Sequence, residues 1–202
     1  GGLAYLGARM APGALLGVTV SQAQAEIARA GLAPLQGRHR VHIAHASFHA
    51  LPDDLGTVDL ACAVEAFVHS NAPERFFSEA ARVLRPGGSL VIVDDLLAER
   101  ALSDQERDWL ATFQAGWVVP SVLTQAQICQ AAADFSLEQS QDLSGWLTLN
   151  RPRDRLVRLL VSTAPRWMDG TPWRRAMKGG DALQRLLTSG AVQYRCLTLR
   201  RR

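Results

Sequence analysis

Glu65 and His69 are the two side chains of this sequence whose types and spacing best suit acid–base chemistry. They lie four residues apart, directly after the apolar run VDLACAV at 58–64. A helical turn over 65–70 would place both on one side. Because histidine titrates near neutrality, His69 could accept a proton from a hydroxyl or a ring carbon while Glu65 orients it. The alternative is structural: Glu65 would cap local amides and His69 would pack over a bound ligand without proton transfer.

A second set of polar side chains, Thr19, Ser21 and Gln24, lies at the end of the apolar run ALLGVTV. Ser21 and Gln24 have the spacing of a capping box, which predicts a helix that ends at Gly31. A cap at the carboxyl end of a strand also lies where ligands bind in open α/β sheets. The hydroxyl and amide groups could therefore bind a ligand, cap the helix, or do both.

The elements that must position these side chains are clearest in residues 57–96. VDLACAV and SLVIVDD read as two buried strands of a parallel sheet. Between them, apolar residues recur at helical spacing, with Asn71 as a candidate cap and Pro86-Gly-Gly as the stop. The apolar face consists of Phe76, Phe77, Ala80, Ala81 and Leu84. This pattern predicts a right-handed strand–helix–strand unit, and we expect Asp94 and Asp95 to face an acceptor.

The order of residues in this unit resembles the centre of a class I S-adenosylmethionine-dependent methyltransferase. The resemblance rests on Asp59, Glu65 and His69, the stretch EAARVLRPGG and a strand ending in Asp94. It is closest to the small-molecule branch that includes tocopherol-type, sterol-type and cyclopropane-fatty-acid-type enzymes, whose GVTxSxxQ pattern GVTVSQAQ also resembles. The resemblance implies an α/β fold with a Rossmann-like, doubly wound, seven-stranded sheet and an antiparallel last strand. It also implies S-adenosyl-L-methionine as cofactor.

By the same resemblance, the amino end holds only part of the family pattern. Gly1 and Gly2 fit the end of the glycine-rich cofactor loop, and LAYLGARM fits the helix after it. The first strand and its acidic residue are missing from this chain. Three explanations stay open: a fragment, a natural protein that starts upstream, or an incomplete cofactor site. A cloning scar at Gly1–Gly2 is a fourth.

The resemblance assigns roles to further residues. Thr19, Ser21 and Gln24 stand where most relatives have a carboxylate that binds the ribose hydroxyls. Ser47 stands where the family has an Asp that holds the adenine amino group, and Phe48 would lie beside the ring. The implied cofactor-binding set is Gly1, Gly2, Thr19, Ser21, Gln24, Ser47, Phe48 and Glu65, with His69 and Glu65 as the candidate catalytic pair.

We expect a single domain over residues 1–202. Residues 1–97 would form the cofactor-binding half, 98–190 a helical acceptor-side insertion plus a sixth strand, and 191–202 the last strand. Further expectations are helices capped by Ser103 and Thr124, a strand at 136–143, an amphipathic helix at 151–163, a loop at 164–180 and a helix capped by Asp181 and ended by Gly190. All five tryptophans follow residue 100, where such enzymes insert helices that close over the acceptor. An apolar or aromatic acceptor is therefore favoured.

Composition narrows the functional classes. The chain has 202 residues and a net charge of +3, with scattered basic residues, which does not favour nucleic-acid binding. There is no apolar run of membrane-spanning length. The three cysteines, far apart in sequence, read as buried thiols of a cytoplasmic protein. No metal site is expected, because His42 and His45 point to opposite faces of an extended strand.

These observations favour transfer of a methyl group to carbon, oxygen or nitrogen of a small, mostly apolar acceptor, by a protein that could be a homodimer. The alternative is a catalytically inactive, methyltransferase-like partner subunit, suggested by the partial glycine loop and by Ser47 in place of Asp. A nucleic-acid methyltransferase has less support, because the sequence has no Asn/Asp-Pro-Pro-Tyr signature after the run at 58–64.

Overall fold

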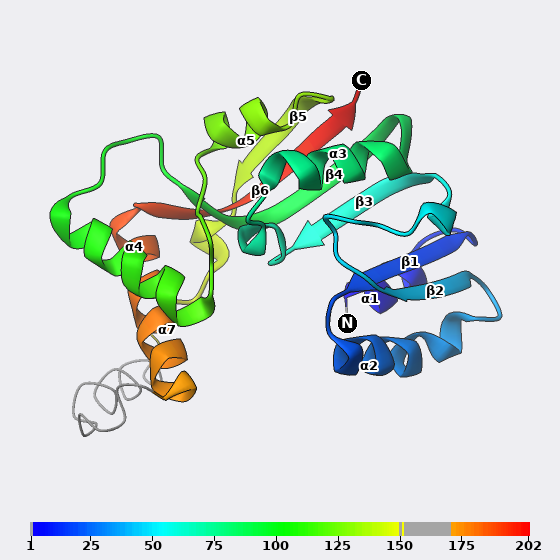
Figure 1. The fold of residues 1–202 in the computed structure, drawn as a ribbon, viewed down its shortest axis with the longest axis horizontal. Coiled ribbons are helices and arrows are strands. Elements are labelled where there is room, and N and C mark those ends of the chain that lie inside the picture. The colour runs from blue at the N-terminus through cyan, green and yellow to red at the C-terminus, as the bar shows by residue number, and fades with distance from the viewer. Residues whose placement is uncertain (1, 150, 152–170) are drawn as a thin grey trace. The chain divides into compact units, whose positions relative to one another are not determined.

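The structure is a computed structural model that describes residues 2–149, 151 and 171–202 (Figure 1). The chain divides into two compact units, Gly1–Thr57 and Val58–Arg202. The predicted amphipathic helix at 151–163 lies almost wholly outside the described residues. The expectation of a single domain stays a prediction.

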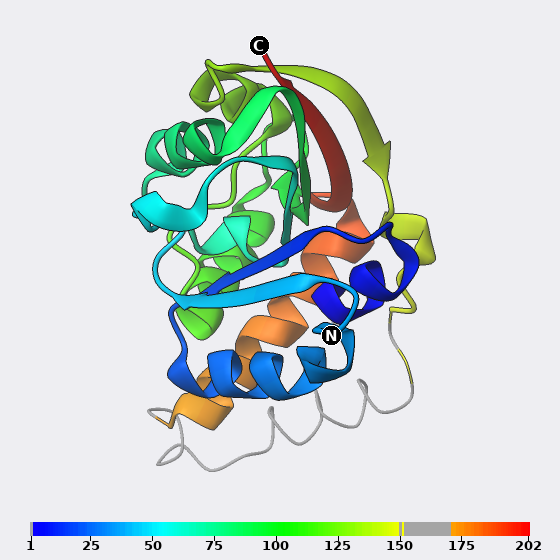
Figure 2. The same ribbon diagram turned by 90° about the vertical axis from the view of Figure 1, so that its right-hand side faces the viewer.

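The first unit consists of two parallel strands and two helices. Its elements are α1 (Gly2–Arg9), β1 (Ala14–Thr19), α2 (Gln22–Leu32), the short 3-10 helix η1 (Ala33–Leu35) and β2 (Arg40–His45). β1 and β2 run side by side, with Thr19 opposite His45 at their carboxyl ends (Figures 1 and 2). Ala25, Leu32 and Ile43 form the buried core, against which Leu3 of α1 packs. The two helices and the two strands, one of which contains His42 and His45, are therefore present as predicted, although α2 continues one residue past the predicted end at Gly31.

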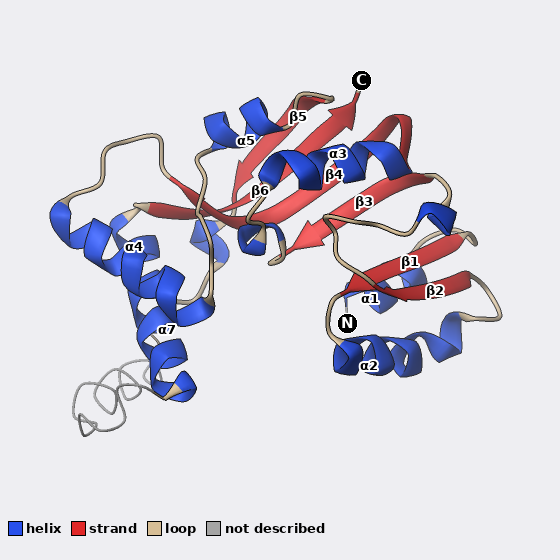
Figure 3. Ribbon diagram, in the orientation of Figure 1, coloured by secondary structure: helices blue, strands red, loops and turns tan. Residues whose placement is uncertain are grey.

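The second unit is built on a four-stranded mixed sheet of order β3-β4-β6-β5 (Figure 3). The strands are β3 (Val58–Val64), β4 (Leu84–Leu97), β5 (Phe135–Asp142) and β6 (Val192–Arg201). β3 and β4 pair in parallel, whereas β6 pairs antiparallel with both β4 and β5. This confirms the expected α/β class and the antiparallel last strand. Six strands are present in the described residues, in sheets of two and four.

Helices α3 (Pro73–Val83) and α5 (Gln125–Ala131) lie on one face of this sheet (Figure 1). An aromatic cluster joins α3 to the sheet: Phe77 lies 5.2 Å from Phe76, 5.4 Å from Phe67 and 6.0 Å from Phe135 between ring centroids. Such tilted and edge-on contacts add stability beyond burial alone. The cluster holds the segment that follows β3 against the helix layer.

The start and end of α3 differ from the prediction. Its N-cap is Ala72 rather than Asn71, and no side chain caps it. The helix ends at Val83, and Pro86-Gly-Gly lies inside β4 instead of stopping the helix. Gly87 has φ of 73°, which suits glycine. Arg85, just past the helix, pairs with Asp59 at 2.7 Å.

Helices α4 (Asp104–Trp117) and α7 (Pro172–Ser189) pack against each other and against the start of β6. The capping boxes predicted at Ser103–Glu106 and Thr124–Gln127 are both formed. The predicted loop up to Gly180 is wrong for its described part, because α7 begins at Pro172 with Thr171 as its cap, and Asp181 lies inside the helix. The helix ends at Gly190, as expected.

Two expectations drawn from the composition can also be compared with the structure. The cysteines are free but not buried: Cys62 and Cys129 are exposed, and Cys196 is half-buried. Of the helices within the described residues, none combines the length and apolar character needed to cross a membrane.

Candidate functional site

Thr19, Ser21 and Gln24 come together at the carboxyl end of β1, in an arrangement that we call the donor corner. The Ser21 amide donates to Thr19 Oγ1 at 3.1 Å, and Thr19 Oγ1 donates to Gln24 Oε1 at 2.8 Å. The Gln24 amide donates to Ser21 Oγ at 3.3 Å. Ser21 therefore caps α2 as predicted, but the Gln24 side chain turns to Thr19 instead of completing the capping box.

This hydrogen-bond chain determines which groups of the donor corner stay available to a ligand. Because its oxygen accepts from Thr19, Gln24 keeps both N–H donors of its carboxamide for an outside acceptor. The Ser21 hydroxyl accepts from a backbone amide and keeps its own hydrogen. Both side chains reach the surface at a strand's carboxyl end. These residues fit a ligand that carries vicinal hydroxyls, such as a ribose.

The remaining predicted residues of the first unit are less specialised. Ser47 lies in a tight turn, where its Oγ accepts from the His49 amide at 3.1 Å, and the Phe48 ring packs edge-on against His49 at 4.6 Å. Gly2 is the first residue of α1, and a Cβ built on it meets nothing within 4 Å. Gly1 lies outside the described residues. His45 Nε2 is 2.9 Å from Val20 O, and the described residues contain no cluster suited to a metal ion.

In the second unit, Glu65 follows β3 and has an unusual backbone. Its φ is 50°, in the left-handed region that non-glycine residues rarely occupy. The Glu65 amide donates to Val93 O at 2.9 Å, which extends the parallel ladder by one bond. The exposed side chain accepts a hydrogen bond from Tyr194 Oη at 3.2 Å.

His69 does not share a helical face with Glu65. The turn after β3 is the short 3-10 helix η3 (Phe67–His69), and Glu65 lies before it. The His69 amide donates to Ala66 O at 3.2 Å, and its side chain is exposed. The predicted pair is therefore near in sequence, but the Glu65 carboxylate is held by Tyr194 and not by His69.

Asp94 and Asp95 have different roles, although they are neighbours in β4, which continues past the predicted strand end to Leu97. Asp94 is 1% exposed, and its carboxylate accepts from the amides of Val68 at 3.0 Å and Asp95 at 3.0 Å. Burial raises the pKa of Asp94, and these backbone donors oppose that rise. Its carboxylate therefore anchors the η3 turn, and the expectation that it faces an acceptor is not supported by these contacts.

Asp95 lies opposite Tyr194 across the β4–β6 ladder. Burial, together with the charges of Asp94 and Glu65, raises the pKa of Asp95 to about 7. Burial and the Glu65 carboxylate raise the pKa of Tyr194 to about 12. Its hydroxyl, which is protonated at neutral pH, donates to Glu65. Sequence reasoning missed Tyr194, which lies in the last strand predicted at 191–202.

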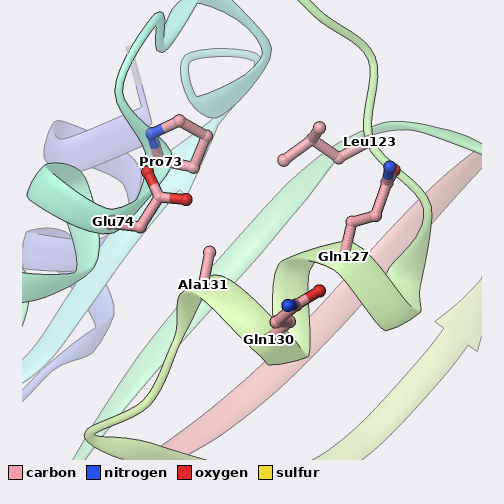
Figure 4. A pocket seen from close by; sticks show the side chains of 6 residues that line it. All are labelled: Pro73, Glu74, Leu123, Gln127, Gln130 and Ala131. Carbon is pink, nitrogen blue, oxygen red and sulfur yellow. The ribbon is translucent and has the colours of Figure 1, made fainter.

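A shallow pocket of about 430 Å³ lies between the first turn of α3 and α5 (Figure 4). Its lining is Pro73, Glu74, Leu123, Gln127, Gln130 and Ala131. Gln127 is already engaged in the Thr124 capping box. None of the predicted site residues lines this pocket.

The amino-terminal part of the chain is similar to known methyltransferases. Residues 1–92 match the family model described as a methyltransferase domain. A sarcosine/dimethylglycine N-methyltransferase of Halorhodospira halochloris is 38% identical over 61 residues, which cover 30% of this chain and 22% of that protein. An O-methyltransferase of Pyrenophora dematioidea is 33% identical over 111 residues, which cover 54% of this chain and 40% of that protein. The chain thus matches less than half of the length of these curated relatives.

Solved structures show a shared fold at low identity. The geranyl diphosphate C-methyltransferase of Streptomyces coelicolor A3(2) superposes with a TM-score of 0.64 at 21% identity, covering 93% of this chain and 63% of that one. An O-methyltransferase of Brevibacillus brevis superposes with a TM-score of 0.66 at 18% identity, covering 92% of this chain and 58% of that one. The [4+2]-cyclase SpnF superposes with a TM-score of 0.63 at 19% identity, covering 98% of this chain and 80% of that one. Because a cyclase shares this fold, the fold alone does not determine the reaction.

The match of residues 1–92 and the shared fold together agree with the predicted resemblance: the amino-terminal part of the chain is similar to a methyltransferase domain, and the chain shares its fold with these solved methyltransferases.

Proposed function

We propose that this protein transfers a methyl group from S-adenosylmethionine to a small, mostly apolar or aromatic acceptor. The attacking atom is carbon, oxygen or nitrogen. The curated relatives are named as N- and O-methyltransferases, which supports an enzyme over an inactive partner subunit.

The observation that carries this proposal is the donor corner. It lies at the end of β1, inside the part of the chain that matches the methyltransferase family. The Gln24 N–H groups and the Ser21 hydroxyl are suited to the ribose of the cofactor, since neutral donors and acceptors can bind hydroxyls without a carboxylate. S-adenosylmethionine, when bound, supplies a methyl group activated on a positively charged sulfur.

The residues of the second unit would serve the acceptor. In an in-line displacement the acceptor atom bonds to the methyl carbon while the carbon–sulfur bond breaks, so alignment is the main contribution of a protein. Glu65, exposed at the carboxyl end of β3, would accept a hydrogen bond or a proton from the acceptor. His69, also exposed after the same strand, is the second candidate for this proton.

An apolar acceptor is supported by the short 3-10 helix η4 (Ser144–Trp146), which follows β5. The Tyr194 amide donates to Ser144 Oγ at 2.9 Å, which ties this turn to the strand that carries Tyr194. Trp146 is 79% exposed. An exposed indole after β5 offers an apolar surface to such an acceptor.

Titration calorimetry with S-adenosylhomocysteine, the product form of the cofactor, tests the proposal. We expect micromolar binding to this chain, and about fivefold weaker binding by Gln24→Ala, because one hydrogen bond contributes about 1 kcal/mol. Gln22→Ala is the matched control, since the Gln22 side chain bonds Glu26 on the exposed face of the same helix. Absence of binding heat, or equal loss in both variants, contradicts the proposed cofactor site.

Methyl transfer is then assayed by release of S-adenosylhomocysteine with a panel of dimethylglycine, a simple phenol and geranyl diphosphate. These probes offer a nitrogen, an oxygen and a carbon for methylation. Turnover with the phenol or geranyl diphosphate above that with dimethylglycine supports an apolar acceptor. No turnover with any probe by a chain that binds S-adenosylhomocysteine favours the inactive alternative.

We also propose a cytoplasmic location and a small-molecule rather than a nucleic-acid partner. The three unpaired cysteines support a reducing compartment. A homodimer is proposed as well, and sedimentation equilibrium tests it directly through the measured mass.

A further inference from the structure

We propose that Tyr194 is a positioning residue whose hydroxyl holds the Glu65 carboxylate in place for the reaction. This inference rests on the proposed function and adds to it a residue that lies about 130 positions from Glu65 in the sequence. It starts from the hydrogen bond of 3.2 Å between Tyr194 Oη and Glu65 Oε1.

The contact spans the sheet. Glu65 follows β3, Tyr194 belongs to β6, and β4 lies between these two strands. Two strand spacings amount to roughly 9–10 Å, so only a long side chain reaches from one to the other. Tyr194 does so from the position opposite Asp95. A tyrosine is well suited to this, because it has few rotatable bonds and a donor at its tip.

The Tyr194 backbone is fixed from both sides. On one side it pairs with β4. On the other, its amide donates to Ser144 Oγ at 2.9 Å and its carbonyl accepts from the Leu143 amide at 2.7 Å. The hydroxyl is therefore presented by a rigid frame. A preorganised donor costs little ordering when a substrate binds.

Glu65, by contrast, needs such a support. Its side chain is exposed, and among the described residues the Tyr194 hydroxyl is the one hydrogen-bond donor to its carboxylate. Its left-handed backbone, φ 50°, is a costly conformation of the kind that persists where surrounding structure enforces it. The ladder bond to Val93 O fixes the main chain, and Tyr194 fixes the side chain.

The local charges favour this assignment. The Glu65, Asp94 and Asp95 carboxylates all act to keep the Tyr194 hydroxyl protonated. The hydroxyl, a donor at neutral pH, therefore also remains a donor in moderately alkaline solution. Phenylalanine at position 194 would keep the ring and remove only this donor.

The first test measures the electrostatic coupling between Glu65 and Tyr194, to which the charge of Glu65 and the hydrogen bond both contribute. The chain has two tyrosines, so in a Tyr5→Phe background ultraviolet absorbance at 295 nm reports ionisation of Tyr194 alone. At pH 11, with folding checked by circular dichroism, we expect about one tenth of Tyr194 to be ionised. Glu65→Gln in this background should raise the ionised fraction at least twofold. An unchanged fraction overturns the inference.

The second test measures the role, with whichever panel probe the wild type methylates. Tyr194→Phe should lower kcat about tenfold and leave the dissociation constant for S-adenosylhomocysteine within twofold. Glu65→Gln and the Glu65→Gln/Tyr194→Phe double variant should be equally slow, because Tyr194 acts through Glu65. A merely structural role would give additive losses. Tyr5→Phe is the matched control and should keep wild-type kcat.

Failure of the proposed function and failure of the Tyr194 assignment give different results. A wild type without turnover overturns the proposed function and this inference with it. Normal turnover by Tyr194→Phe, or additive losses in the double variant, overturns the inference alone.

Discussion

At the scale of single residues, Asp95 makes stability depend on pH in an unusual direction. Its pKa is raised to about 7 from the ordinary 3.8, so between these values the folded state holds more proton than the unfolded state. Stability contributed by this group is therefore complete below about pH 4, falls as pH rises, and levels off above about pH 7. Asp95→Asn should match the wild type at pH 4 and exceed it at pH 8 by on the order of 3 kcal/mol.

Denaturant unfolding at the two pH values measures this difference. Asp108→Asn is the matched control, since Asp108 is exposed and lies within α4. We expect this substitution to change the free energy of unfolding by the same amount at both pH values. A gain by Asp95→Asn that is the same at pH 4 and pH 8 would show that Asp95 does not titrate as described.

The residues of the candidate site differ in how well the sequence alone could locate them. Thr19, Ser21 and Gln24 are close in sequence, so a local capping pattern was enough to bring them together. Glu65 was found because it follows an apolar run. Its partner Tyr194 could not be found that way, because their contact depends on strand order, which places β6 next to β4. The different roles of Asp94 and Asp95 depend on burial, which alternates from one strand residue to the next.

At the scale of elements, α7 shows where local patterns mislead. Thr171 and Pro172 read as part of a loop, yet a capping threonine followed by proline in the first turn favours a helix. Gly179 and Gly180 also read as breakers. In the structure α4 passes so close that Gly179 contacts Gly116 and Trp117, which a larger residue would obstruct. Tertiary packing thus overrides low helix propensity here.

This packing predicts opposite effects for two neighbouring substitutions. A Cβ at position 179 would lie 2.7 Å from Trp117 Cδ1, whereas one at 180 would lie 3.7 Å from Trp117 Cζ2, an ordinary contact. Gly179→Ala should therefore destabilise by about 1–3 kcal/mol through overpacking. Gly180→Ala should stabilise by about 0.5–1 kcal/mol through helix propensity. Urea unfolding of both variants tests this, and equal effects would contradict the close approach of α4 and α7.

At the scale of the whole molecule, the two units differ in the size of their cores. Buried apolar residues of the first unit are Leu15, Ala25, Leu32, Ile43 and Ala44, many fewer than in the second. A small unit buries a smaller fraction of its surface and is less stable. In addition, β1 and β2 each have one strand neighbour, whereas β4 and β6 each have two. We therefore expect amides of β1 and β2 to exchange hydrogen faster than those of β4 and β6.

The cofactor should reduce this difference, because the donor corner belongs to the first unit. A ligand that binds the folded state at a hundredfold excess over its dissociation constant adds about 2.7 kcal/mol, which slows exchange through unfolding about a hundredfold. Hydrogen exchange followed by mass spectrometry, with and without S-adenosylhomocysteine, should show this slowing in residues 14–45 of the wild type and, at the same ligand concentration, about fivefold less of it in Gln24→Ala. Exchange that is equal across both units, and slowed everywhere by the ligand, would instead support the single cooperative domain that the sequence predicts.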